Sequence, residues 1–539
     1  MLGTGTYTLT NTGNEIASLA ANTGTLSVTN NHDFSLGSIV TTGNVELSST
    51  GTVTQTGAIT GGQNVNLLGT AGTYTLTNAA NAMGTLTANT GSVKLVTSSG
   101  QSTGVINTTG ALNLTSNTLA INGNIDAGAG NITLNTHILT VNSGTVKSSG
   151  ALQIAAKSAG TTICIGGGTG TLQITATNFS TDFVDGFSEI MIGGENQSGN
   201  IDVDTTVLKD ALTRQTTGSI TQSGAITGDQ NLTLLGGGAH TLNNVDNAIG
   251  QLTATSSTLA FRGESFTLGN IATTGAVQLS STGTVTQASD TAITGDQALS
   301  LSGVGGTYTL NNTGNEISSL AANTGTLSVT NNHDFTLLSI TTSGDVELSS
   351  TGTVTQTGAI TGGQNVNLLG TGGTYTLTSA SNSIGTLTAN TGSVELVNSS
   401  AQTTGAITTT GALNLTANAL TLGAINTGST VTLSSTGAVT QTGAITGGQN
   451  VNLLGTGGTY TLTNASNAIG TLTANTGSVA LVNSSAQTTG AITTTGALNL
   501  TSDSLTINEN IATVAGNIPF NTDVLAVARG KMVAGEVAL

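Results

Sequence analysis

The sequence predicts an all-β chain that folds as a single-stranded parallel β-helix, a solenoid with about three short strands in each turn of roughly 20 residues. Three observations lead to this fold class. Segments of the chain repeat at a fixed spacing, apolar and polar residues alternate within the repeats, and signals for helices are absent. We expect the coil to be right-handed.

Internal repeats occur at two levels. Residues 5–70 and 306–371 are nearly identical, and the run GAITGGQNVNLLGTGGTYTLT begins at both Gly358 and Gly443. A finer unit consists of glycine followed by x-apolar-x-apolar. It is found as GTLSV, GNVEL, GSVKL, GALNL and GNITL, and clearly recognisable copies begin about 20 residues apart. A fixed period of this size is typical of a solenoid in which each repeat forms one turn, so we expect about 26 turns.

Three copies of one unit indicate which side chains face the interior. The copies GSVKL, GSVEL and GSVAL keep their valine and leucine and vary the residue between them, which is Lys94, Glu395 or Ala480. A position that accepts a cation, an anion and a methyl group faces solvent, so the flanking apolar pair points inward with a period of two. That period predicts a strand, and the Gly, Asn, Ser and Thr residues between the runs favour bends.

The composition excludes several classes of protein. The 539 residues include 76 glycines but only one proline, which excludes a collagen triple helix. Only 6% of the residues are charged and the net charge is −17, so neither nucleic acid nor an anionic lipid surface is an expected partner. No apolar run is long enough to insert into a membrane as a helix. The single cysteine, Cys164, is interpreted as a small buried side chain.

The repeats divide the chain into four parts. We expect β-helix repeats over residues 1–176 and 215–525, an irregular charged and aromatic insertion at 177–214, and an irregular tail at 526–539. The insertion has two interpretations: an enlarged turn whose phenylalanines cover a local core, or a loop that binds cations or a partner. The tail is interpreted as a poor cap or as out-of-frame sequence.

All five tyrosines occupy one motif, GTYTL, and a sixth copy carries histidine in the aromatic position. These positions are Tyr7, Tyr74, Tyr308, Tyr375, Tyr460 and His240. Seven residues later each copy has an asparagine: Asn14, Asn81, Asn247, Asn315, Asn382 and Asn467. One interpretation is a repeated structural turn, with asparagine at a bend and a half-exposed aromatic side chain beside it. The other is an aromatic stripe that stacks on sugar rings.

No residues combine into a catalytic or metal-binding motif. The four histidines are His32, His137, His240 and His333, and the run NNHDF around His32 and His333 is interpreted as a polar turn. Residues Asn521 to Asp523 match only a fragment of the polygalacturonase pattern, whose other members are missing. We therefore expect no catalytic, cofactor-binding or metal-binding residues, and no cofactor.

Runs such as GNVELSSTGTVTQTGAITGGQNVNLLG resemble the β-helical repeats of filamentous haemagglutinin-like bacterial surface proteins. The run DGFSEIMIGGENQSGNIDV resembles an insertion common in very large bacterial extracellular repeat proteins. The resemblance covers roughly residues 3–525 and implies an exported adhesin at the cell surface or outside the cell. The secretion domain and signal peptide of that family are missing, so we interpret the chain as a fragment of a longer passenger.

The sequence leaves three functional classes open. The first is an extracellular structural or adhesive rod without catalysis, whose partners would be molecules or carbohydrate on a host or neighbouring cell. The second is an ice-binding or amyloid-like surface, suggested by Thr-x-Thr pairs. The third is a β-helical carbohydrate-active enzyme, which would need acidic and basic residues clustered on one strand face. We also expect end-to-end self-association of the isolated chain.

Overall fold

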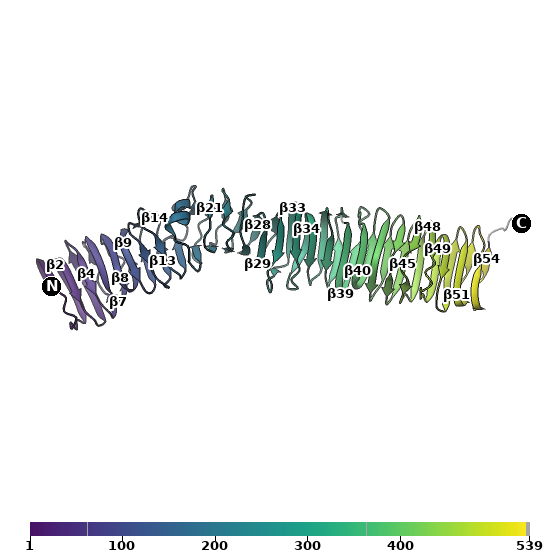
Figure 1. The fold of residues 1–539 in the computed structure, drawn as a ribbon, viewed down its shortest axis with the longest axis horizontal. Helices are drawn as coiled ribbons and strands as arrows, with labels where there is room; N and C mark the ends of the chain where they lie inside the picture. Colours follow the sequence, from purple (N-terminus) through teal and green to yellow (C-terminus); the bar gives the residue numbers. More distant parts are fainter. Residues whose placement is uncertain (62, 363, 535–539) are drawn as a thin grey trace. The chain divides into compact units, whose positions relative to one another are not determined.

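The computed structural model describes residues 1–61, 63–362 and 364–534, and within them the chain is almost entirely β-strand. The strands are parallel and stack as a β-solenoid of about 28 turns with roughly 19 residues per turn (Figure 1). This confirms the predicted fold class, with turns slightly shorter than the sequence spacing suggests. Among the described residues, no helix is long and apolar enough to cross a membrane.

Tertiary contacts divide the chain into two compact units, Met1–Thr273 and Thr274–Leu539. The main strands of the first unit are β1 (Leu2–Leu9), β2 (Ser18–Thr29), β4 (Val45–Ser48), β5 (Thr52–Gln55), β7 (Asn64–Leu76), β8 (Thr85–Val96), β10 (Leu112–Thr115), β13 (Ile132–Asn135), β16 (Leu152–Ala155), β17 (Ile163–Gly166), β19 (Ile190–Gly193), β20 (Ile201–Val203), β22 (Leu212–Gln215), β23 (Ile220–Gln222), β25 (Leu232–Leu235), β26 (Ala239–Leu242) and β28 (Thr258–Arg262).

Apolar side chains of the first unit stack in ladders along its interior. Tyr74 on β7 pairs with Val93 on β8, Val93 with Leu112 on β10, and Leu112 with Ile132 on β13. All four side chains are buried, whereas Lys94, next to Val93, is exposed. The inside and outside positions therefore follow the prediction from the repeated GSVKL unit.

The second unit repeats this arrangement. Its main strands are β30 (Val277–Ser280), β33 (Gln297–Leu310), β34 (Ile317–Thr330), β36 (Val346–Ser349), β39 (Asn365–Leu377), β40 (Thr386–Val397), β42 (Leu413–Thr416), β45 (Thr430–Ser434), β48 (Asn450–Leu462), β49 (Thr471–Val482), β51 (Leu498–Ile507), β52 (Ile511–Thr513), β53 (Phe520–Val527) and β54 (Met532–Ala534). Val394 and Val479, the sister residues of Val93, are also buried. The exposed Glu395 and the half-buried Ala480 occupy the outward position between them and the next leucine.

A glycine forms the bend inside each of the long strands β7, β39 and β48. Gly69, Gly370 and Gly455 have φ angles of +108°, +109° and +107°, in the region that favours glycine. A Cβ atom on Gly69 would lie 1.9 Å from the carbonyl oxygen of Ser49 in the preceding turn. Close stacking of turns and the positive φ both require glycine here, which explains part of its abundance.

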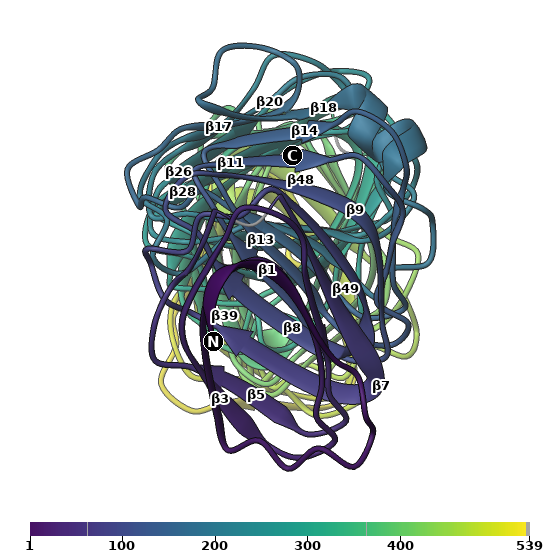
Figure 2. The same cartoon turned by 90° about the vertical axis from the view of Figure 1, so that its left-hand side faces the viewer.

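The insertion at 177–214 contains the π-helix η1 (Asn178–Asp182), whose coil projects from the outside of the turns in Figure 2. Its phenylalanines, Phe179, Phe183 and Phe187, are buried. The rings of Phe179 and Phe183 meet edge to face, with centroids 5.7 Å apart. These contacts support the interpretation of the insertion as an enlarged turn that covers a local core.

Cys164 is a free, buried cysteine on β17, as the sequence suggests. Its side chain lies under the glycine-rich loop after β17, where a Cβ atom on Gly168 would come within 3.0 Å of the sulfur. Burial, together with the charges of Asp202 and Asp204, raises the pKa of the thiol. The cysteine is therefore a covered and weakly acidic packing group.

Candidate functional site

Four tyrosines of the GTYTL motif lie in the interior of the solenoid and form hydrogen bonds there. Tyr74, Tyr308, Tyr375 and Tyr460 are fully buried. The hydroxyl group of Tyr74 donates to the carbonyl oxygen of Leu47 in the preceding turn at 2.8 Å and to that of Leu68 at 2.7 Å. The expectation of half-exposed aromatic rings is therefore wrong for these four copies, because their phenol groups reach buried carbonyl groups across the lumen.

The asparagines of the same motif join one turn to the next. Asn81 is fully buried, and its Nδ2 donates to the carbonyl oxygens of Leu76 and Val96 at 3.2 and 3.0 Å. Its Oδ1 accepts from Ile59 N and from Gln55 Nε2 at 2.8 and 2.6 Å. The same contacts recur in the sister copies centred on Asn247, Asn315, Asn382 and Asn467. The motif is thus a repeated structural turn, and these four buried tyrosines cannot form an aromatic platform for sugars.

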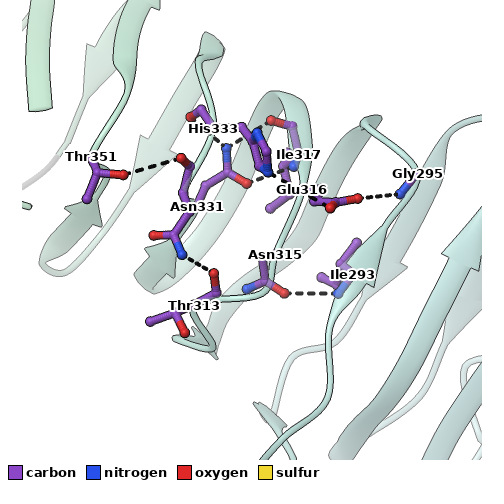
Figure 3. A network of polar contacts seen from close by, with 10 residues as sticks. Ile293, Gly295, Thr313, Asn315, Glu316, Ile317, Asn331, His333 and Thr351 are labelled. Carbon is purple, nitrogen blue, oxygen red and sulfur yellow. Dashed lines mark hydrogen bonds and ion pairs between the residues drawn. The ribbon is translucent and has the colours of Figure 1, made fainter.

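The NNHDF runs form polar turns, as predicted (Figure 3). Asn331 holds the backbone of Ile317 through both its side-chain atoms, at 2.7 and 3.0 Å. The exposed His333 places Nε2 3.9 Å from Oε1 of Glu316. Asp334 accepts a hydrogen bond from the backbone of Thr353 at 2.6 Å and so fixes the next turn. Across the described residues, no group of three or more His, Cys, Asp and Glu side chains is arranged to hold a metal ion.

The remaining predicted polar residues are separate from one another. His137 lies beside Ser158 Oγ and Thr161 Oγ1, at 3.3 and 3.4 Å from its ring nitrogens. His240 is fully buried on β26. The Asn521 to Asp523 segment lies on β53, where the Thr522 hydroxyl donates to the carbonyl oxygens of Asp503 and Val524. Among the residues that the structure describes, none of these side chains forms an ion pair with a carboxylate.

The outer surface of the first unit carries an open groove of about 620 Å³. Its floor is formed by the outward side chains of β10, β13, β16, β19 and β22, which pair in that order. One row of the floor runs from Thr133 through Gln153 to Met191, and a second contains Thr115, Asn135 and Ala155 in register. The groove therefore crosses successive turns and is built by the stacking itself.

Two loops, 156–159 and 194–197, form the walls of the groove. Gln197 fastens them to each other, because its buried Nε2 donates to the carbonyl oxygens of Ala159 and Thr161 at 2.8 and 2.5 Å. Gln153 Nε2 donates to the carbonyl oxygen of Gly193 at 3.1 Å. The Lys157 ammonium donates to Asn117 Oδ1 at 2.7 Å. The walls are thus held in place by hydrogen bonds before any ligand arrives.

Most of the polar groups lining the groove are uncharged. Among the described residues that line it, Lys157 and Glu195 are the charged ones, and the other polar lining groups are amides, hydroxyl groups and backbone. Amides and hydroxyl groups supply both donors and acceptors, so the groove suits a neutral ligand rich in hydroxyl groups. The residues Thr133, Asn135, Gln153 and Lys157 carry no signal in the sequence that distinguishes them from other outward polar residues. Among the lining residues, Met191 and the wall at 194–197 belong to the insertion that the sequence marks as irregular.

Comparison with known proteins identifies a repeat family. Residues 23–90, 195–256, 254–323, 324–391 and 410–476 match the family described as Repeats of unknown function (DUF5649). No curated protein and no solved structure matches the chain. The matched segments lie in both compact units and together cover more than half of the sequence. The chain therefore belongs to the family of Repeats of unknown function (DUF5649).

Proposed function

We propose that this chain is a structural and adhesive rod of an extracellular or surface-bound bacterial protein, and that it acts by binding and not by catalysis. Its repetitive β-solenoid is consistent with a structural rod. Interior ladders connect successive turns within a unit, and at the copies of the GTYTL motif buried tyrosine hydroxyl groups and asparagine side chains add hydrogen bonds between turns. Such a scaffold presents outward side chains at fixed positions without a separate support for each one.

Export to the cell surface is part of this proposal. The resemblance of the repeats to filamentous haemagglutinin-like proteins supports it, because proteins of that family are secreted adhesins. The 8 basic residues among 539 are too few to form a cationic surface for nucleic acid, so the proposal includes no nucleic-acid partner.

The groove on the first unit is the observation that supports adhesion most directly. It combines fastened walls, a floor of aligned polar side chains and few charges. We propose that it binds a neutral glycan chain lying along the stacking direction, with hydroxyl groups paired to Asn135, Gln153 and Gln215. The Met191 side chain and the methyl group of Ala155 supply the apolar patches against which a sugar face packs.

Glycan binding to the purified full chain tests this function. On an array of neutral and acidic oligosaccharides, we expect the wild-type chain to bind neutral members. The double variant Asn135→Leu/Gln153→Leu should lose that binding. The control Asn414→Leu changes an outward amide on β42, in the second unit and outside the groove, and should bind as the wild type does. Equal binding by the groove variant and the control, or binding to no glycan, would refute the proposed site.

A further inference from the structure

A charged side chain lies inside the first unit without a partner. Arg214 on β22 points inward and pairs in register with Ile192 in the preceding turn and Leu234 in the next. It is fully buried, and none of its three guanidinium nitrogens has a hydrogen-bond partner. Within the described residues it belongs to no ion pair. Two carboxylates beside this strand are engaged elsewhere: Asp210 accepts from Gly186 N, and Glu189 accepts from the hydroxyl of Thr213, the residue before Arg214.

A second unpartnered polar side chain lies in a nearby turn. His240 on β26 sits between Ile220 and Leu259 in its ladder and is fully buried. Neither of its ring nitrogens has a hydrogen-bond partner. Burial and the positive charge of Arg214 lower the pKa of His240 to about 4, so its ring is neutral at pH 7 and keeps one N–H donor. Burial lowers the pKa of Arg214 to about 9, which leaves the guanidinium charged at pH 7.

The sister copies show that these two residues change together. In four GTYTL copies, a tyrosine hydroxyl donates to the carbonyl group of an inward leucine in the preceding turn: Leu47, Leu279, Leu348 or Leu433. Arg214 takes the place of that leucine, because it pairs with Leu234 as Leu47 pairs with Leu67. His240 takes the place of the tyrosine. A Leu–Tyr pair is thus replaced by an Arg–His pair in one copy.

A buried guanidinium without a counter-charge is strongly unfavourable, so such groups are normally paired. No carboxylate of the described residues pairs with Arg214, and the five N–H groups of Arg214 together with the His240 N–H all require acceptors. An anion would satisfy the charge and the donors at once. We propose that Arg214 and His240 hold a small inorganic anion of chloride size in the lumen of the solenoid, between β22 and β26.

Halide dependence of the full chain tests this site. Amide hydrogen exchange is measured in sodium chloride, sodium bromide and sodium gluconate at the same ionic strength. In the wild-type chain, we expect chloride and bromide to slow exchange in β22, β25 and β26 in a saturable manner, because an anion bound only by the folded state stabilises it. Crystals containing bromide should show an anomalous peak between the Arg214 guanidinium and the His240 ring.

Two variants act as controls because they use pairs already present in the chain. Arg214→Leu/His240→Tyr restores the pair of the sister copies and should fold without any halide response. Leu348→Arg/Tyr375→His transfers the pair to the second unit and should add a halide response in β36 and β39. The proposal is overturned if wild type and Arg214→Leu/His240→Tyr respond alike to halide, or if the bromide crystals show water only at this position.

Discussion

Two neighbouring residues of β8 give a sharp test of the interior ladders. Val93 is 1% exposed and lies between Tyr74 and Leu112, whereas the adjacent Lys94 is exposed and lies between Thr75 and Asn113. We compare Val93→Asp with Lys94→Glu, since both place a carboxylate on the same strand. The carboxylate would face the lumen in the first variant and the solvent in the second.

The structure gives very different costs for the two changes. Lys94→Glu should change stability by no more than about 0.5 kcal/mol. The second unit supports this value, because Glu395 lies there between Thr376 and Asn414, the same residue types that flank Lys94. Val93→Asp removes about 1.5–3 kcal/mol of apolar burial and adds an unpaired buried carboxylate, for a total of at least about 4 kcal/mol.

Local hydrogen exchange is the appropriate assay, because repeat proteins need not unfold in one cooperative step. We expect fast exchange in β7, β8 and β10 of the Val93→Asp variant and wild-type exchange in the Lys94→Glu variant. Thermal melts should show the same order. Similar exchange and melting in both variants would refute the assignment of interior and exterior positions.

Three further predictions follow from the buried tyrosines and the ends of the strand stack. Tyr74→Phe should cost about 1–2 kcal/mol, since the carbonyl oxygens of Leu47 and Leu68 lose the one hydroxyl proton that they share, although Leu68 keeps its hydrogen bond from Ser49 N. Tyr375→Phe should cost the same in urea unfolding because its partners are equivalent. Burial raises the pKa of Tyr308 and Tyr460 to about 12, while unfolded tyrosines ionise near pH 10. Stability should therefore be unaffected below about pH 10 and fall between about pH 10 and 12, and a flat stability across that interval would contradict the burial. The 539-residue chain alone should self-associate end to end, because β53 exposes Val524, Leu525 and Val527. A stable monomer in sedimentation at micromolar concentration would contradict this prediction.

The repeats predict the fold because they compare one position in several contexts. The Lys94, Glu395 and Ala480 series indicates an outward site without any structure, and the burial of their neighbours agrees. The same pattern also indicates that the tyrosines are buried, contrary to the expectation of half-exposed rings. Tyr74 and Leu76 are two residues apart, as Val93 and Leu95 are, and the two pairs stack on each other. Tyrosine carries a polar hydroxyl group, which favours the interpretation of an exposed ring. A tyrosine ring is nevertheless stable in a core when its hydroxyl group donates a hydrogen bond to a carbonyl oxygen.

The repeat period alone does not predict the groove or the buried Arg–His pair. The groove combines outward residues from strands between Thr115 and Gln215 with two loop walls, and only the stacking register brings them together. Arg214 is two residues after Leu212, so the period of two places it inside. The charge of Arg214 favours an exposed position, but the side chain is buried, as the period of two predicts.

Protection of the groove by a bound glycan tests the proposed adhesive function most directly. Hydrogen exchange is measured for the full chain with and without the neutral oligosaccharide that binds it most tightly on the array. We predict slower exchange in residues 153–159 and 191–197 and unchanged exchange throughout the second unit. Protection confined to other segments, or no protection at saturating glycan, would contradict the assignment of binding to this groove.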